Sequence, residues 1–149
     1  MKVELRPITE ADLPTFYAHQ ADPAVSAMAG FTPREHDTFY LHWRTKVLRD
    51  PNTSKHAVTA DGVLAGTIVG FDREAKRLVG YWYGKAHWGR GIASEALRQF
   101  LMHETQRPLC AWVIPSNGAS MRVLEKHGFV RGEHHVDEKG VEEILFTLP

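Results

Sequence analysis

Two glycines flank an arginine at residues 89–91, and this Gly-Arg-Gly segment is where the chain offers its clearest chemistry. Glycine turns the backbone tightly and leaves no side chain between the peptide N–H groups and an approaching group. Apolar residues at helical spacing follow from Ile92. Because the first N–H groups of a helix lack internal partners, this corner predicts a cradle for a phosphate or pyrophosphate, to which Arg90 adds a full charge.

The same corner also has a plain structural interpretation, since many strand-to-helix connections use glycine only to turn. Two familiar phosphate-loop patterns are absent. The chain has no GxxxxGK[ST], and no third glycine and spaced acidic residue complete a dinucleotide fingerprint. The loop by itself therefore leaves both interpretations open.

The elements around this loop are predicted from hydrophobic pattern. Residues 77–83 mix β-branched and aromatic side chains, which favours a strand, and the helix from Ile92 is expected to end at Arg107-Pro108. The run 109–114 is too continuously apolar for a strand with one wet face, so we expect a buried central strand with Cys110 as a core residue.

The C-terminal part of the chain predicts a short helix and a hairpin. Asn117 stands where the helix begins, and Gly128 is placed to end it. Residues 129–136 and 141–148 then flank an Asp-Glu-Lys-Gly turn.

The N-terminal part predicts a strand over residues 2–8 and a helix over residues 9–20. A Thr-Pro start signal predicts a second helix over residues 32–48, and the Ala- and Gly-rich residues 23–31 are expected to form a compact, mobile connection. Residues 55–71, with Asp-Gly at their centre, predict a hairpin.

Residues 88–96, Trp-Gly-Arg-Gly-Ile-Ala-Ser-Glu-Ala, resemble the coenzyme loop of the GNAT superfamily of acetyl-CoA-dependent N-acetyltransferases. They look most like the ribosomal-protein-alanine/serine N-acetyltransferase (RimJ/RimL-like) branch. A second motif of the family is matched by residues 117–120 and 124–129. The resemblance covers nearly the whole chain.

This resemblance implies an α/β (mixed α+β) fold of the GNAT acyl-CoA N-acyltransferase type, formed by residues 1–149 as a single domain. The expected architecture is a central mixed, mostly antiparallel twisted sheet of about seven strands flanked by about four helices. The strands at 77–83 and 109–114 are expected to part at one end and to hold the pantetheine arm of acetyl-CoA, whose amides pair with free backbone groups.

The resemblance also implies which residues contact acetyl-CoA. A backbone N–H of the strand that ends at Tyr83 is expected to polarise the thioester carbonyl and to hold the oxyanion. The predicted coenzyme-binding residues are Tyr81, Trp82, Tyr83, Trp88, Gly89, Arg90, Gly91, Ile92, Ala93, Ser94, Asn117 and Ser120.

Ser120 is the candidate general acid for the leaving thiolate. Many members of the family carry a tyrosine where this chain has Leu124, so Ser120, a water, or another tyrosine such as Tyr83 must act instead. Asn117 has a second interpretation as a helix N-cap, which is compatible with a coenzyme contact.

The general base is not assigned. Glu133, His134 and His135 are candidates, but an exposed strand face is the interpretation we favour for them. Adjacent strand residues point to opposite faces, so the two histidines do not share an ion, and no metal is predicted.

Composition limits the partners. Lysine plus arginine equals aspartate plus glutamate at 18 each, so no nucleic-acid or anionic membrane surface is expected. The single cysteine and the absence of an apolar leader at the N-terminus favour a cytoplasmic protein. Its oligomeric state is left open between a monomer and a homodimer.

The expected activity is direct acetyl transfer from acetyl-CoA to a primary amine, either a protein N-terminus or a small-molecule amine. A non-catalytic domain of the same fold that binds or senses acyl-CoA is the alternative, and a generic nucleotide-phosphate binder is a third. Fold and motif do not choose the acceptor.

Overall fold

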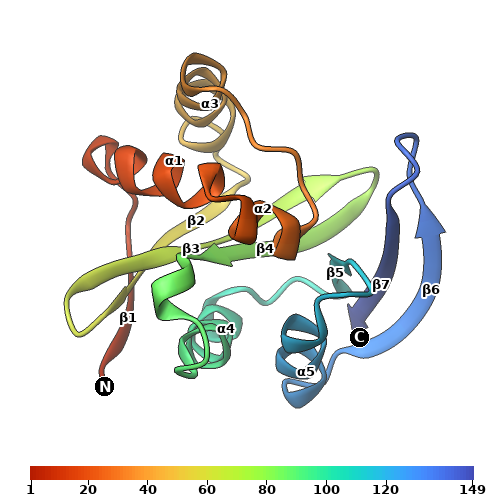
Figure 1. The fold of residues 1–149 in the computed structure, drawn as a ribbon. Helices are drawn as coiled ribbons and strands as arrows, with labels where there is room; N and C mark the ends of the chain where they lie inside the picture. The colour runs from red at the N-terminus through yellow and green to blue at the C-terminus, as the bar shows by residue number, and fades with distance from the viewer.

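A seven-stranded sheet runs through the molecule in the computed structural model, which describes residues 1–149 (Figure 1). Its strand order is β1-β2-β3-β4-β5-β7-β6, and every neighbouring pair is antiparallel except β4 and β5, which are parallel. The strands are β1 (Val3–Arg6), β2 (Ser54–Ala60), β3 (Val63–Arg73), β4 (Lys76–Tyr83), β5 (Leu109–Val113), β6 (Val130–Val136) and β7 (Glu142–Leu148).

Helices cover both faces of this sheet (Figure 1). One face carries α1 (Leu13–Ala21), α2 (Pro23–Ala29) and α3 (His36–His42), and the other carries α4 (Ile92–His103) and α5 (Gly118–Lys126). Short helical turns precede α1 at Glu10–Asp12 and α4 at Lys85–His87, and a π-helical turn continues α3 over Trp43–Val47. The expected mixed α/β architecture is confirmed, with one more helix than the sequence indicates.

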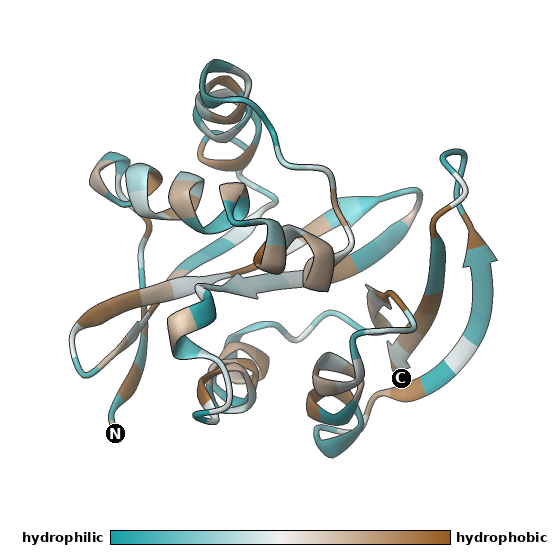
Figure 2. Cartoon of the chain, in the orientation of Figure 1, coloured by the Kyte–Doolittle hydropathy of each residue, from teal (hydrophilic) through white to brown (hydrophobic).

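The two faces of the sheet have separate hydrophobic clusters. Under α4 and α5, the fully buried residues include Ile68, Leu97, Phe100 and Phe146. Under α1 and α3 a smaller cluster consists of Leu13, Phe16, Phe39, Trp43 and Ala57. Each such large side chain contributes roughly 1.5–3 kcal/mol by leaving water. In contrast, β6 is exposed along its length and is largely hydrophilic in Figure 2.

The β2–β3 hairpin forms as predicted, because Asp61 and Gly62 both adopt the positive φ that a tight two-residue turn requires. A register shift follows at Val58/Thr59, opposite Gly66. A Cβ at Gly66 would overlap the carbonyl oxygen of Trp82 on β4. The glycine thus allows a close approach of the two backbones.

Residues 23–29 form a helix, so the prediction of a mobile connection over residues 23–31 is wrong. Asp22 caps α2 by accepting a hydrogen bond from Ala24 N at 2.9 Å, Pro23 occupies the first helical position, and Gly30 ends the helix at φ 79°. These are the standard start and stop signals of a helix.

The predicted helix start at Thr32 is also wrong, since α3 begins at His36 with Glu35 as its N-cap. The buried amide of Gln20 donates to the carbonyl oxygen of Arg34 at 3.0 Å and accepts from its N–H at 2.7 Å. This pair of bonds meets the hydrogen-bonding needs of Arg34 outside a helix.

The α4 helix ends at His103, four residues before the predicted end at Arg107-Pro108. Its cap residue, Glu104, is buried and accepts a hydrogen bond from Arg77 Nε at 2.7 Å. Arg77 Nη1 also donates to the carbonyl oxygen of Asn52 at 2.7 Å. A buried carboxylate needs such a partner, and Glu104 finds this one on β4 at the point where α4 ends.

The parallel strands β4 and β5 pair at only two positions, Arg77 with Leu109 and Leu78 with Cys110. Beyond Leu78 they part, which confirms the predicted splay. The Arg77–Glu104 ion pair therefore lies at the closed end of the gap. Cys110 is buried beside it, as predicted for a core residue.

Candidate active site

A cavity of about 500 Å³ occupies the gap between β4 and β5. Every predicted coenzyme residue except Arg90 lines this cavity. The α2 helix and the segment after it add Val25, Met28, Ala29 and Phe31 to the lining, which the predicted coenzyme residues do not include. Their apolar spacing after a capped Asp-Pro start is the signal that identifies them.

The loop before α4 has the geometry of an anion site. Gly89 and Gly91 adopt φ of 73° and 80°, a region that favours glycine, and nothing lies within 4 Å of a Cβ placed on either one. No side chain caps α4, and the N–H groups of Arg90, Gly91 and Ile92 donate to no acceptor in the chain. These donors lack a partner and lie at the positive end of a helix dipole, where an anion is favoured.

Arg90 lies outside the cavity lining, and its contact with the coenzyme stays a prediction. The guanidinium is exposed, and its Nη1 lies 3.4 Å from His87 Nδ1. Its charge still adds to that of Lys85 near the loop, so the field around the free N–H groups favours an anion.

Trp88 ties this loop to the end of β4. Its indole Nε1 donates to the carbonyl oxygen of Tyr83 at 2.9 Å, and the half-buried ring packs against the main core. Ser94, one turn into α4, lies 3.1 Å from His127 Nε2 at the end of α5. Burial lowers the pKa of His127, which keeps this contact neutral near pH 7.

The three aromatic residues at the end of β4 point to alternate faces of the sheet, as strand geometry requires. Tyr81 and Tyr83 share one face, with ring centroids 5.9 Å apart, while Trp82 packs edge-on against Trp43 on the other. The hydroxyl of Tyr83 is buried without a partner, and burial raises its pKa well above the usual value. Tyr83 therefore stays neutral.

Ser120 and Tyr81 are in contact inside the cavity, with Ser120 Oγ 2.8 Å from the phenol oxygen. Burial raises the pKa of Tyr81 to about 12, and the bond to Ser120 opposes this increase. The two residues are 39 positions apart in the sequence, so no local pattern predicts the contact.

Asn117 uses its amide within the protein. Its Oδ1 accepts from Ser120 N at 3.1 Å, which confirms the N-cap interpretation, and its Nδ2 donates to the carbonyl oxygen of Met28 at 2.9 Å. One side chain thus joins α5 to α2 across the cavity. Its direct contact with a coenzyme stays a prediction.

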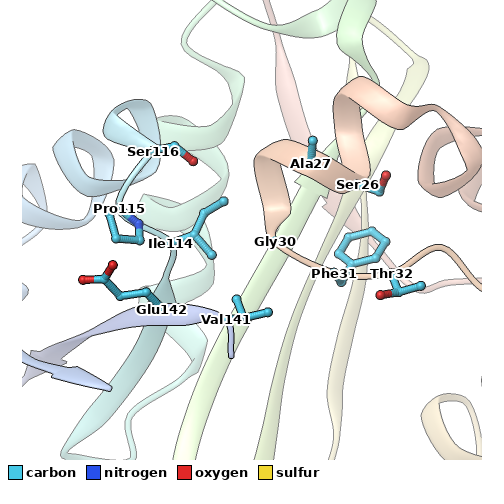
Figure 3. Close-up of a pocket in the computed structure, with 10 residues that line it drawn as sticks. All are labelled: Ser26, Ala27, Gly30, Phe31, Thr32, Ile114, Pro115, Ser116, Val141 and Glu142. Atoms are coloured by element: carbon cyan, nitrogen blue, oxygen red, sulfur yellow. The ribbon is translucent and has the colours of Figure 1, made fainter. Parts of the chain in front are cut away.

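A second cavity of about 510 Å³ adjoins the first, and the two share Phe31 and Ile114 (Figure 3). Its walls come from α2, from the turn after β5 and from the start of β7 (Figure 3). Gly30 packs directly on Ile114, where a Cβ would overlap the isoleucine side chain. Glu142 is the only carboxylate in the lining of either cavity.

None of the three candidate bases lines either cavity. Glu133, His134 and His135 lie on the exposed strand β6. The ring of His135 lies 5.4 Å from that of Trp112, and His134 Nδ1 lies 2.8 Å from Glu142 Oε1. His134 therefore approaches the second cavity through Glu142, and His135 approaches the first through Trp112, which lines it.

Two further features of the chain concern ions and membranes. No group of three or more His, Cys, Asp or Glu side chains is arranged to hold a metal ion. None of the helices has the length and apolar character needed to cross a bilayer.

The family model for the acetyltransferase (GNAT) domain matches residues 2–130. In sequence, the chain is 47% identical over 55 residues to the probable N-acetyltransferase YjcK of Bacillus subtilis (strain 168), a match that covers 34% of this chain and 30% of that protein. The match thus spans less than a third of that relative.

Two solved structures are similar in fold. Spermidine N-acetyltransferase from Vibrio cholerae, in complex with CoA and spermine, has a TM-score of 0.80 at 17% identity, over 98% of this chain and 95% of that one. RimL, a ribosomal L7/L12 alpha-N-protein acetyltransferase in complex with CoA, has a TM-score of 0.82 at 16% identity, over 97% and 92%. At these identities the similarity concerns the fold.

Proposed function

The chain belongs to the GNAT acetyltransferase family, and we propose that residues 1–149 act as one domain that binds acetyl-CoA between β4 and β5 and transfers the acetyl group directly to a primary amine. The observation that carries this proposal is the cavity between two strands that part, opening at an uncapped helix start. In this arrangement the free N–H groups of the glycine loop hold the pyrophosphate.

The pantetheine arm then lies along the gap as an added strand. Past Leu78, β4 has β3 on one side and no pairing with β5 on the other, so its backbone offers unpaired groups to the two amides of the arm. A backbone N–H of β4 polarises the thioester carbonyl and stabilises the oxyanion that forms when the amine attacks. Direct transfer requires this positioning and no covalent enzyme intermediate.

The acceptor amine enters from the second cavity, which meets the first at Phe31 and Ile114. An amine is protonated at neutral pH, and Glu142 is the carboxylate that this cavity offers to attract the ammonium and to accept its proton. Both relatives of known structure act on amines by name, one on spermidine and one on a protein N-terminus. We assign this chain to the RimJ/RimL-like branch on its loop sequence, and the acceptor to cationic primary amines.

The test is release of free CoA thiol from acetyl-CoA in the presence of a panel of acceptors. The panel contains short peptides with free N-termini, polyamines and aminoglycosides. Acceptor-dependent thiol release, with a matching gain of an acetyl group by mass, is the expected result. CoA binding without release across the panel would instead identify a non-catalytic acyl-CoA-binding domain.

Competition with other nucleotides separates coenzyme recognition from general phosphate binding. ATP and NAD present only the pyrophosphate end, so they should displace CoA weakly because nothing of theirs fills the gap between β4 and β5. Displacement as strong as that by CoA itself would contradict the assignment of the gap to pantetheine.

A further inference from the structure

We infer that Tyr81 is a positioning residue for Ser120: its phenol donates to Ser120 Oγ, and the proton of the serine is thereby directed to the sulfur of bound CoA. This inference rests on the proposed function. The observation behind it is the 2.8 Å contact between the two oxygens inside the cavity. Tyr81 comes from β4 and Ser120 from the first turn of α5.

The direction of this hydrogen bond follows from the two hydroxyls. A phenol is the more acidic group and the weaker acceptor, so Tyr81 donates and Ser120 accepts. Burial raises the pKa of Tyr81 to about 12, so its proton stays in place at neutral pH. Tyr81 has no other hydrogen-bond partner in the chain.

The proton of Ser120 is then free for a ligand. In a helix, a serine hydroxyl often donates to the carbonyl oxygen four residues earlier, but Ser120 Oγ makes no such bond here. The backbone N–H of Ser120 is held by Asn117 Oδ1 at 3.1 Å, which fixes the first turn of α5. The backbone of Ser120 is thus fixed, and its hydroxyl proton remains available to a ligand in the cavity that Ser120 lines.

The helix that carries Ser120 has no other hydroxyl group. Leu124, one turn further on, has no hydroxyl and is fully buried in the main core. Tyr83 has a hydroxyl, but it lies buried without a hydrogen-bond partner, and the hydroxyl of Ser94 lies 3.1 Å from His127 Nε2. Tyr81 and Ser120 are the two hydroxyl residues of the cavity lining that are hydrogen-bonded to each other.

In the reaction, the amine nitrogen forms a bond to the thioester carbon and the C–S bond breaks, with its electron pair going to sulfur. Two protons leave the nitrogen, one before and one after the new bond forms, and the thiolate gains one from water as CoA departs. Ser120 donates a hydrogen bond to the thiolate while it exists, and Tyr81 keeps its own proton throughout. A donor to the thiolate favours the charged form and so lowers the thiol pKa.

The pKa of the CoA thiol in the complex tests this without any acceptor. It is measured by titrating the ultraviolet absorbance of the thiolate in CoA bound to the wild-type chain and to variants. Tyr81→Phe and Ser120→Ala should each raise the thiol pKa by about 0.5–1 unit, a three- to tenfold change in ionisation constant. The double variant should show no further increase, because Tyr81 acts only through Ser120.

Controls separate this role from a structural one. Ser120→Thr keeps a hydroxyl and should retain the lowered thiol pKa. Tyr17→Phe removes the same atom from a tyrosine that lines neither cavity and should change nothing. With an active acceptor, kcat should fall about three- to tenfold in Tyr81→Phe while KM for acetyl-CoA holds.

Each contrary result has a distinct meaning. If the wild-type chain binds no CoA, the proposed function fails and this inference fails with it. If CoA binds but Tyr81→Phe leaves the thiol pKa unchanged, or if the two single effects add in the double variant, the role of Tyr81 is refuted while the proposed function stands.

Discussion

Gly91 combines two requirements in one residue. Its φ of 80° favours glycine, and the space beside it is open, so the peptide groups around it face whatever binds there. Gly62, in the β2–β3 turn, has the same φ and the same open surroundings, yet it lies at a hairpin tip away from the cavity. Substitutions at Gly91 and at Gly62 can therefore be compared to separate the effect of backbone strain from the effect on coenzyme binding.

We predict that Gly91→Glu abolishes CoA binding, because a carboxylate placed among the free N–H groups repels the pyrophosphate and fills its site. Gly62→Glu should carry a similar strain of about 1 kcal/mol and bind CoA as the wild type does. Isothermal titration with CoA and thermal unfolding of both variants provide the comparison. Equal CoA affinity in the two variants would exclude the loop as the pyrophosphate site.

Glu142 supplies the only negative charge in the lining of the cavities, whereas its neighbour Glu143 points to the other face of β7. We predict that Glu142→Gln raises KM for a cationic acceptor several-fold and leaves KM for acetyl-CoA unchanged. Glu143→Gln is the matched control and should alter neither constant. If steady-state kinetics show that Glu142→Gln acts on KM for acetyl-CoA instead, the second cavity is not the acceptor site.

At the scale of elements, α2 and α5 form opposite walls of the coenzyme cavity, and the Asn117 side chain joins them by its hydrogen bond to Met28. The same side chain caps α5. Aspartate preserves the cap, because its carboxylate also accepts from Ser120 N, but it loses the donor to Met28.

We predict that Asn117→Ala lowers the free energy of unfolding by about 1 kcal/mol through loss of the cap, and that Asn117→Asp does not. Both variants should bind CoA more weakly, because both lose the bridge to α2. Chemical denaturation gives the first quantity and titration with CoA the second. Wild-type affinity in Asn117→Asp would show that the cavity does not depend on the bridge.

Local sequence signals predicted most helices and strands, but they did not distinguish two similar signals for a helix start. Asp22-Pro23 and Thr32-Pro33 are both N-cap and proline pairs, and only the first begins a helix. The difference is the buried amide of Gln20, which satisfies the backbone of Arg34 and so removes the need for a helix there. That contact is tertiary, and no pattern over neighbouring residues reveals it.

The features of the candidate site also divide into those that could be predicted from the sequence and those that depend on tertiary packing. The glycine loop and the cap at Asn117 follow from residue types and spacing, the parting of β4 from β5 follows from the family resemblance, and the structure has all three. The Tyr81–Ser120 contact and the second cavity depend on how distant segments pack, so the sequence indicates neither. Arg90 shows the converse, since its type suits a phosphate but its side chain lies outside the lining.

For the whole molecule, four histidines are kept neutral by their surroundings. Burial is the main cause that lowers the pKa of His19, His42, His56 and His127 below the ordinary 6.5. In the unfolded chain these groups take up protons at a higher pH than in the folded one. Their contribution to stability is therefore complete above pH 6.5 and decreases as the pH falls through the folded values.

We predict that Tm falls steadily as the pH is lowered from neutral through 6.5, before the carboxylates titrate. His19→Asn removes one of the four groups, so the acid-side loss of Tm should be smaller in that variant. Calorimetry over this range measures both. A Tm that is constant or rises on acidification would contradict the assignment of neutral, partly buried histidines.

The two pairs that join β4 to β5 divide the sheet into an antiparallel half of four strands and another of three. The two halves pair only at these positions, and the Arg77–Glu104 ion pair between β4 and the end of α4 lies beside them. A change in the angle between the halves alters the width of the gap without breaking a hydrogen bond inside either one. The opening can thus adjust to the thickness of its occupant while both halves keep their own pairing.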